Sequence, residues 1–187
     1  SLPAPLHEAL QKVTAGKPFP WVWVATSDPD RGARVRTVRL LSYNLLQGSW
    51  TFACHRDHAK LHQVTTDPRG QLCLLREDGP LQVRIDVLLA ASSGESHPQG
   101  LRLWQKVAPP QRRALYQAHP HTPQPPESFW LMEARLDPID RAVEGWHPRI
   151  EVLVLGEEPR RTVWERRGGE GADEASLPEQ AWRTTKN

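Results

Sequence analysis

Short β-type runs separated by tight turns restrict the fold of this chain more than any other feature of its sequence. Valine, threonine, leucine and aromatic residues dominate the runs, and glycine, asparagine, aspartate and proline fill the links. Consecutive strands joined by such short turns form an antiparallel sheet, and this number of strands predicts a barrel. In the first half of the chain the runs cover residues 19–26, 34–41, 49–55, 71–76 and 81–91.

The first run contains Trp21-Val22-Trp23-Val24, which is aromatic or β-branched throughout, so we expect a strand buried on both faces. Strand patterns return in the second half of the chain. The strands expected there cover residues 128–136, 142–146, 149–155 and 161–166.

Helical spacing of apolar residues and helix stop signals predict four helices. The second is expected to have Asp57 as its N-cap and to end before Asp67-Pro68. We expect the later two helices to pack outside the barrel. The helices cover residues 5–16, 57–66 and 101–107, and a short one opens at Pro109-Pro110.

The length of 187 residues fits a single domain, and composition marks no second boundary. We expect the core to cover about residues 18–167, with the N-terminal helix packed onto it. Residues 168–176 are rich in glycine and acidic residues and are expected to form a flexible loop. Trp182, near the end, is expected to fold back onto the body of the protein.

Composition excludes several classes of protein. No apolar run approaches the roughly 18 residues of a membrane span, and the N-terminal residues lack the apolar segment of a signal peptide. We therefore expect a cytoplasmic protein that does not enter the membrane. The net charge of +2, with acids and bases interspersed, gives no basic patch for nucleic acid.

The cysteines and histidines do not form a metal-binding pattern. Cys54 and Cys73 fall in expected strands without metal-ligand spacing, so we expect two buried reduced thiols. His119 and His121 lie close together in sequence, but no carboxylate or cysteine clusters with them. No metal site is expected.

Three basic residues, Arg36, Arg39 and Lys60, are carried by elements that we expect to touch each other. A lysine in the first turn of a helix opposes the helix dipole, so Lys60 is well placed only if an anion binds at that N-terminus with it. The position of Lys60 therefore favours a bound phosphate group as the ligand. The alternative is that strand arginines are solvated and that Lys60 covers apolar surface with its stem.

The order of several short motifs resembles the pyridoxamine 5'-phosphate oxidase-like family of FMN-binding split barrels, over about residues 18–164. The motifs are Arg36-Thr37-Val38, a lysine at a helix start (Lys60), Asp67-Pro68-Arg69, Gln82-Val83-Arg84-Ile85, a tryptophan-bearing helix and a Pro-x-x-Arg-Arg helix. The resemblance lies in their order rather than in any one of them. It implies a single mainly β domain with peripheral helices, built as an antiparallel split β-barrel.

The resemblance also implies roles for individual residues. Arg36 and Lys60 match the residues that bind the FMN phosphate, and the backbone through Val38 matches the segment that runs along the cofactor. Gln82 matches a glutamine that hydrogen-bonds the cofactor, although a polar residue on an exposed sheet face is the alternative. The expected cofactor-binding residues are Arg36, Thr37, Val38, Arg39, Cys54, Lys60 and Gln82.

The sequence departs from the family pattern at several of these positions. His58 and Ala59 stand where many relatives have a serine-arginine pair, so one phosphate ligand is missing. Cys54 replaces a usual threonine, and Val87 a frequent glycine. The nearby basic residues Arg39, His55 and Arg56 are the candidates to compensate.

The resemblance implies an FMN-dependent oxidoreductase that acts on a small-molecule substrate and forms a homodimer with the flavin site across its two-fold interface. A non-catalytic split-barrel binding module that has lost flavin is the competing hypothesis. A heme-handling relative ranks last, because it needs an axial ligand from His97, His119 or His121.

The same resemblance argues against a working pyridoxamine 5'-phosphate oxidase. Leu41 stands where those enzymes have a lysine that binds the substrate phosphate. Their Arg-x-His segment has its nearest counterpart at residues 160–164, which contain arginine but no histidine. We therefore expect a substrate with less charge, such as an aromatic or apolar molecule that lies against a tryptophan.

Overall fold

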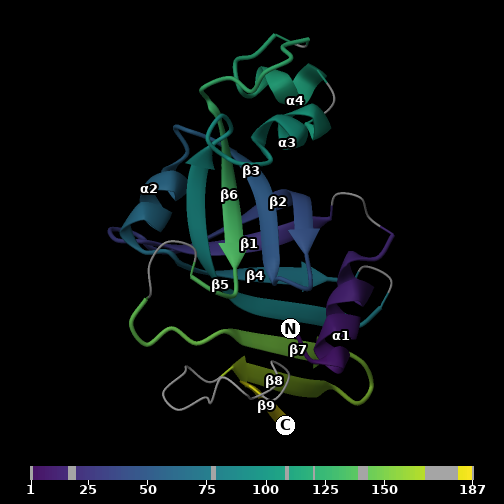
Figure 1. The fold of residues 1–187 in the computed structure, drawn as a ribbon. Coiled ribbons are helices and arrows are strands. Elements are labelled where there is room, and N and C mark those ends of the chain that lie inside the picture. The colour runs from purple at the N-terminus through teal and green to yellow at the C-terminus, as the bar shows by residue number, and fades with distance from the viewer. Residues whose placement is uncertain are drawn as a thin grey trace.

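Nine strands form one antiparallel sheet in the part of the chain that this computed structural model describes, which is residues 2–16, 20–76, 79–107, 110–119, 121–138, 143–166 and 181–186 (Figure 1). The strands are β1 (Trp21–Asp28), β2 (Gly32–Asn44), β3 (Ser49–His55), β4 (Arg69–Leu75), β5 (Leu81–Ser93), β6 (Phe129–Arg135), β7 (Arg149–Val154), β8 (Arg160–Arg166) and β9 (Trp182–Lys186). The helices are α1 (Ala4–Thr14), α2 (Ala59–Thr66), α3 (Gly100–Lys106) and α4 (Pro110–Ala114).

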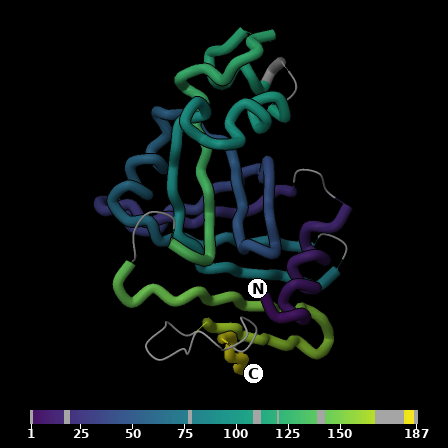
Figure 2. The backbone as a smooth tube through the Cα atoms, in the orientation of Figure 1, coloured from purple at the N-terminus to yellow at the C-terminus, as the bar shows by residue number. Residues whose placement is uncertain are grey.

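Six of the strands close into a barrel in the order β1-β2-β3-β6-β5-β4, because β4 pairs with both β1 and β5. The first part of the long strand β5 also pairs with β7, and β8 and β9 continue the sheet from there. The smooth trace of Figure 2 shows this extension below the barrel, on the side where the chain starts and ends. The expected antiparallel barrel, mainly β with a few helices, is confirmed.

The barrel interior is filled by side chains that alternate along each strand. In β1, Val22 and Val24 are fully buried, whereas Trp21 is 55% exposed and Trp23 is 40% exposed. The prediction that this run is buried on both faces was therefore wrong. Its alternation is that of an antiparallel strand with a single covered face, and both tryptophans lie on the outside of the barrel.

Helices cover the barrel at three places. Leu6, Leu10 and Val13 of α1 join the main core, while α2 packs against β1 and β5. Helices α3 and α4 lie outside the barrel, at the top of Figure 1, as expected. A second apolar cluster includes Trp104 of α3 and, from the strands, Leu41, Phe129 and Leu131.

Three local predictions have different outcomes. Helix α2 begins at Ala59 with His58 as its N-cap, and no side chain caps it, so the prediction of Asp57 was wrong. The expected strand over residues 142–146 is a turn from Val143 to Trp146, and residue 142 lies outside the described residues. Strand β9 was not predicted, but Trp182 at its start is buried in the main core, as expected.

The described helices offer no candidate for a membrane span, since none is both long and apolar enough. Cys54 is buried and Cys73 is partly buried, and both are free thiols. The acidic segment over residues 168–176 lies outside the described residues.

Candidate functional site

Arg36 and Gln63 link strand β2 to helix α2 at one end of the barrel. Arg36 donates from Nη2 to Gln63 Oε1 (2.9 Å) and from Nη1 to Thr26 Oγ1 (2.8 Å). Thr26 Oγ1 also donates to Gln63 Oε1 (2.7 Å), and Gln63 Nε2 donates to Asp28 Oδ2 (2.8 Å). Because Gln63 and Thr26 are both buried, this network fixes the position of the Arg36 guanidinium.

Lys60, one helical turn before Gln63, is a buried cation with little compensation. Lys60 is 8% exposed, and its Nζ lies 3.2 Å from Nδ1 of His58. Among the described residues, no carboxylate forms an ion pair with Lys60 or with Arg36. Burial lowers the pKa of Lys60, and the charge of Arg36 lowers it further. A buried ammonium is unfavourable unless an anion lies beside it, so this position favours the binding of an anion.

His58 completes the polar surroundings of Lys60. Its Nδ1 also accepts a long hydrogen bond from the backbone N–H of His55 (3.4 Å), so two donors face the same ring nitrogen. Partial burial lowers the pKa of His58, and the positive charges of Lys60, His55 and Arg36 lower it further, against a smaller opposing effect of Asp57. The ring is therefore neutral near pH 7, with its proton on Nε2.

These features give the start of α2 the charge and the donors that a multiply charged anion requires. Arg36 and Lys60 bring two positive charges together, and the N-terminus of α2 adds the positive end of a helix dipole. A phosphate monoester fits such a site, because charge-assisted hydrogen bonds from two cations satisfy several of its oxygens.

Two other expected cofactor residues are packed inside the barrel. Val38 is 7% exposed and Cys54 is 1% exposed, and both belong to the main core. Burial raises the pKa of the Cys54 thiol to about 12, so this cysteine is neutral. Their side chains support the barrel wall that carries Arg36 and against which α2, with Lys60, packs.

The remaining expected residues, Thr37, Arg39 and Gln82, lie on the outer face of the barrel wall. Thr37 pairs with the exposed Trp23, and the Arg39 guanidinium lies over the Trp21 ring at 5.2 Å from its centroid. Gln82 donates from Nε2 to Cys73 Sγ (2.9 Å), and Cys73 pairs with Trp23.

Arg36 lies on the face of the barrel wall opposite to Thr37, Arg39 and Gln82. Successive side chains of a strand point to opposite sides, and Arg36 pairs with the buried Val24 whereas Thr37 pairs with the exposed Trp23. The structure thus brings Arg36 and Lys60 together within one chain. It places Gln82 on the other side of the wall.

Sequence reasoning did not identify Thr26 and Gln63 as part of this site. The signal for Gln63 is its spacing, since residues three apart on a helix share a face and Gln63 follows Lys60 by three. The signal for Thr26 is alternation, because it follows Val22 and Val24 on the buried face of β1. His58 was noted only as a departure from the family pattern.

The histidines considered as metal or heme ligands are separate from this site. His97 Nδ1 accepts from the backbone N–H of Gln99 (3.0 Å), and His119 Nδ1 accepts from that of His121 (3.3 Å). Within the described ranges, no group of three or more His, Cys, Asp or Glu residues has a geometry suited to a metal ion.

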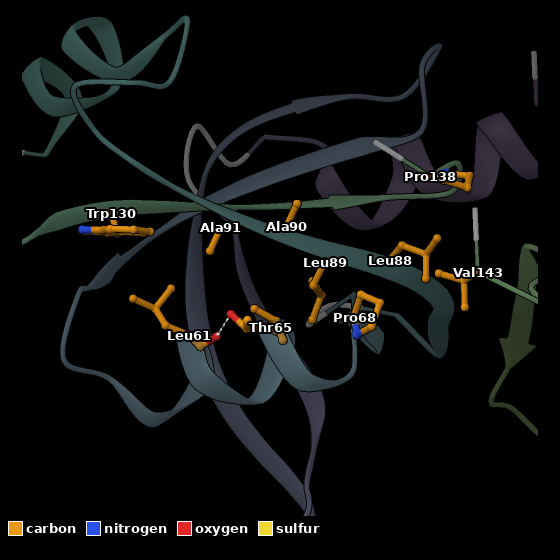
Figure 3. A pocket seen from close by; sticks show the side chains of 11 residues that line it. Leu61, Thr65, Pro68, Leu88, Leu89, Ala90, Ala91, Trp130, Pro138 and Val143 are labelled. Atoms are coloured by element: carbon orange, nitrogen blue, oxygen red, sulfur yellow. Dashed lines mark hydrogen bonds between the residues drawn. The ribbon is translucent and has the colours of Figure 1, made fainter. Parts of the chain in front are cut away.

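A cavity of about 360 Å³, lined mostly by apolar residues, lies on the other side of α2, between this helix and strands β5 and β6 (Figure 3). Leu61 and Thr65 of α2 face into it, with Trp130 at one end and Pro68 toward the other. The remaining lining residues are Val64, Leu88, Leu89, Ala90, Ala91, Pro138 and Val143. A cavity of this size and character suits an uncharged molecule.

Residues 160–164, the nearest counterpart of the Arg-x-His segment, contain an arginine that already forms an ion pair within the protein. Arg161 Nη2 donates to Glu151 Oε1 (2.7 Å), and Arg149 binds the same carboxylate oxygen (2.6 Å). The hydrogen bond from Arg161 is the main cause that lowers the pKa of Glu151. Leu41 is buried in the apolar cluster of Trp104.

No family model matches the sequence, and no curated protein matches it. Solved structures do resemble it. A pyridoxamine 5'-phosphate oxidase-related, FMN-binding protein from Nostoc punctiforme superposes with a TM-score of 0.70 at 18% identity, over 98% of this chain and 94% of that one.

Two further structures agree with the first. PhzG from Burkholderia lata, in complex with tetrahydrophenazine-1-carboxylic acid, gives a TM-score of 0.62 at 17% identity, over 98% of this chain and 89% of that one. General stress protein 26 from Bacillus anthracis gives a TM-score of 0.52 at 13% identity, over 82% of this chain and 96% of that one. The chain therefore has the split-barrel fold of the pyridoxamine 5'-phosphate oxidase-related, FMN-binding proteins.

Proposed function

We propose that this protein binds FMN and uses it for redox chemistry on a small-molecule substrate. The observation that carries the proposal is the pair of Arg36 and Lys60, two cations held together at one barrel end without a carboxylate partner among the described residues. A buried ammonium of this kind is costly unless an anion compensates it. The fold of an FMN-binding protein supports FMN as the source of that anion.

The residues present fit the phosphate end of FMN. Arg36 has further N–H donors beyond the two that Thr26 and Gln63 accept, and Lys60 has further donors beyond the one directed at His58. Each charge-assisted bond to the phosphate contributes about 1.5 to 3 kcal/mol. When bound, the isoalloxazine ring supplies hydride transfer, and the protein supplies position and electrostatics.

A homodimer is part of the proposal. The tryptophan face, which we define as Trp21, Trp23, Val35 and Leu75, exposes large apolar side chains on the outside of β1, β2 and β4. Such a patch favours contact with another protein surface. Gln82 lies beside this face, so a second copy packed there would bring the two copies' glutamines close to the interface.

We propose that the substrate is not a phosphorylated pyridoxine derivative. Leu41 is 6% exposed beneath α3 and offers no donor, and Arg161 is already bound to Glu151. A substrate dianion would therefore lose the charge-assisted contacts it needs. An uncharged aromatic or apolar molecule suits the cavity beside Trp130 better.

The alternative function, a split-barrel binding module without flavin, is favoured by one observation. Both terminal nitrogens of Arg36 already donate to Thr26 and Gln63, so part of the site is satisfied without a ligand. A module of this kind would purify colourless and would not take up FMN.

The deciding experiment is the absorption spectrum of the purified protein before and after addition of FMN, followed by titration with FMN and with riboflavin. We expect a bound-flavin spectrum and clearly tighter binding of FMN, because riboflavin lacks the phosphate. Absence of FMN binding would overturn the proposal in favour of the alternative.

A further inference from the structure

His58 is the N-cap of α2, one of the two positions where the resemblance implies a serine-arginine pair, and its ring lies beside Lys60. Its Nδ1 lies 3.2 Å from Nζ of the buried Lys60. An anion that accepts a hydrogen bond from Lys60 thus lies within a few ångströms of the imidazole. The ring itself is exposed enough to exchange protons with solvent.

We propose that His58 is the third cation of the phosphate site, and that it takes up a proton from solvent when a phosphate binds beside Lys60. The inference rests on the phosphate site proposed above. It assigns to His58 the charge that the missing arginine of the family pattern would otherwise carry.

The charged groups around His58 determine whether its ring is protonated, both without a ligand and with a bound phosphate. Lys60 of α2, Arg36 of β2 and His55 at the end of β3 disfavour the imidazolium, and Asp57 alone favours it among the charges that act on the ring. Cys54, behind Lys60, is a neutral thiol. Without an anion the ring is therefore neutral, and its Nδ1 accepts the Lys60 and His55 hydrogen bonds.

A bound phosphate reverses this balance. Two negative charges beside Lys60 offset the positive charges of Lys60 and Arg36, and a phosphate oxygen within hydrogen-bond distance can accept a hydrogen bond from the ring. The imidazolium then becomes favourable, and Nδ1 changes from acceptor to donor. By linkage, a ligand that raises the pKa of a group binds more tightly as the pH falls through that pKa. The affinity for the phosphate should thus increase as the pH falls from the pKa of His58 in the complex toward its lowered pKa in the ligand-free protein.

The test compares wild type with His58→Asn and with a control, His62→Asn. Asparagine places an oxygen near the position of Nδ1, so it keeps an acceptor for Lys60 but does not titrate. His62 is exposed on the same helix, and replacing it removes a histidine without touching the site. Because all three proteins bind the same ligand, the ionisation of the phosphate cancels when they are compared.

Affinity for FMN is measured by flavin fluorescence at about pH 8 and about pH 6, and proton uptake by calorimetry in two buffers of different ionisation enthalpy. We expect the ratio of wild-type to His58→Asn affinity to rise about threefold to tenfold at the lower pH, since a tenfold change corresponds to one pKa unit. Wild type should take up a larger fraction of a proton than His58→Asn. His62→Asn should follow wild type, and riboflavin should show no such dependence.

The same titration with inorganic phosphate separates this inference from the proposed function. If FMN binds but wild type and His58→Asn show the same pH dependence, the role of His58 is overturned and the phosphate site stands. If FMN does not bind but inorganic phosphate binds with proton uptake that His58→Asn abolishes, the FMN assignment fails and the role of His58 holds. Failure to bind either ligand overturns both.

Discussion

The guanidinium of Arg36 donates to the side-chain oxygen of Gln63 at 2.9 Å, which links strand β2 to helix α2 beside the proposed phosphate site. Gln63 is 3% exposed, and it uses its amide group in both directions, as acceptor from Arg36 and as donor to Asp28. Gln63 therefore orients Arg36 and anchors the helix that carries Lys60, the two cations of the proposed phosphate site.

Replacing Gln63 with leucine should destabilise the protein. The change keeps the approximate size of the side chain but removes the hydrogen bonds that Thr26, Arg36 and Asp28 make with Gln63 at the barrel end. We expect the free energy of unfolding to fall by about 1 to 3 kcal/mol, measured by urea denaturation. His62→Leu, on the exposed side of the same helix, should change it by less than about 0.5 kcal/mol. Equal effects of the two changes would show that the network is not stabilising.

Alanine at Arg36 or Lys60 should weaken FMN binding by about 1.5 to 3 kcal/mol, the contribution of one charge-assisted hydrogen bond. Riboflavin affinity should change little, because riboflavin lacks the phosphate that these residues are proposed to contact. Arg31→Ala is the control, since Arg31 is an exposed cation in the turn between β1 and β2. If wild type binds FMN and riboflavin equally well, the assignment of the phosphate site is wrong.

Lys60→Met should separate stability from ligand binding. Methionine fills the buried volume without a charge, so the ligand-free variant should be more stable than wild type by about 1 kcal/mol while binding FMN poorly. The gain should depend on pH. Burial lowers the pKa of Lys60 below its ordinary value of 10.5, so the unfolded chain binds more protons than the folded one in the alkaline range.

Wild-type stability, relative to Lys60→Met, should therefore rise as the pH increases toward about 10.5 and the buried ammonium loses its proton. Thermal unfolding of both ligand-free proteins between about pH 7 and pH 10 measures the difference. A constant difference across that range would indicate that Lys60 is not destabilised by burial.

Much of this architecture follows from the sequence, and the exceptions have physical causes. Runs of β-branched and other apolar residues, separated by turn signals or by helical patterns, predict β1 to β6 and hence the barrel. The prediction that Trp21 and Trp23 are buried was wrong, because large aromatic residues occur both in the interior of proteins and at exposed surfaces that contact another protein. Strand β9 has a polar sequence after Trp182, so no apolar alternation marks it, and it forms because the edge of β8 is free to pair.

The site was predictable only in part. The positions of Arg36 and Lys60 follow from strand and helix periodicity, but their convergence depends on α2 docking against β1 through Gln63 and Thr26. A contact between residues 37 apart in sequence leaves no local signal. The side of the wall that Gln82 occupies follows from strand register, which the sequence specifies only once the pairing partners are known.

Trp23→Glu should disrupt the proposed dimer. The tryptophan is 40% exposed on the outer face, and a buried carboxylate at a two-fold contact would meet its own copy. Sedimentation should show a monomer for the variant and a dimer for wild type, and FMN should make the wild-type dimer more resistant to dilution. The exposed Leu115→Glu, on α4's side of the molecule, is the control. A wild-type monomer that binds FMN tightly would contradict the proposal.

FMN-loaded protein should not oxidise pyridoxamine 5'-phosphate or pyridoxine 5'-phosphate at rates usual for enzymes, which are about 1 per second or more. The position that would need a cation for the substrate phosphate is Leu41, whose side chain is packed against the cluster of Trp104, and Leu41→Lys should therefore destabilise the protein rather than restore activity. Product formation is followed with both substrates on wild type and on Leu41→Lys. Turnover by wild type would mean that other side chains receive the substrate phosphate. If Leu41→Lys is stable and gains turnover, Leu41 does border the substrate, and the apolar packing around it is looser than the structure implies.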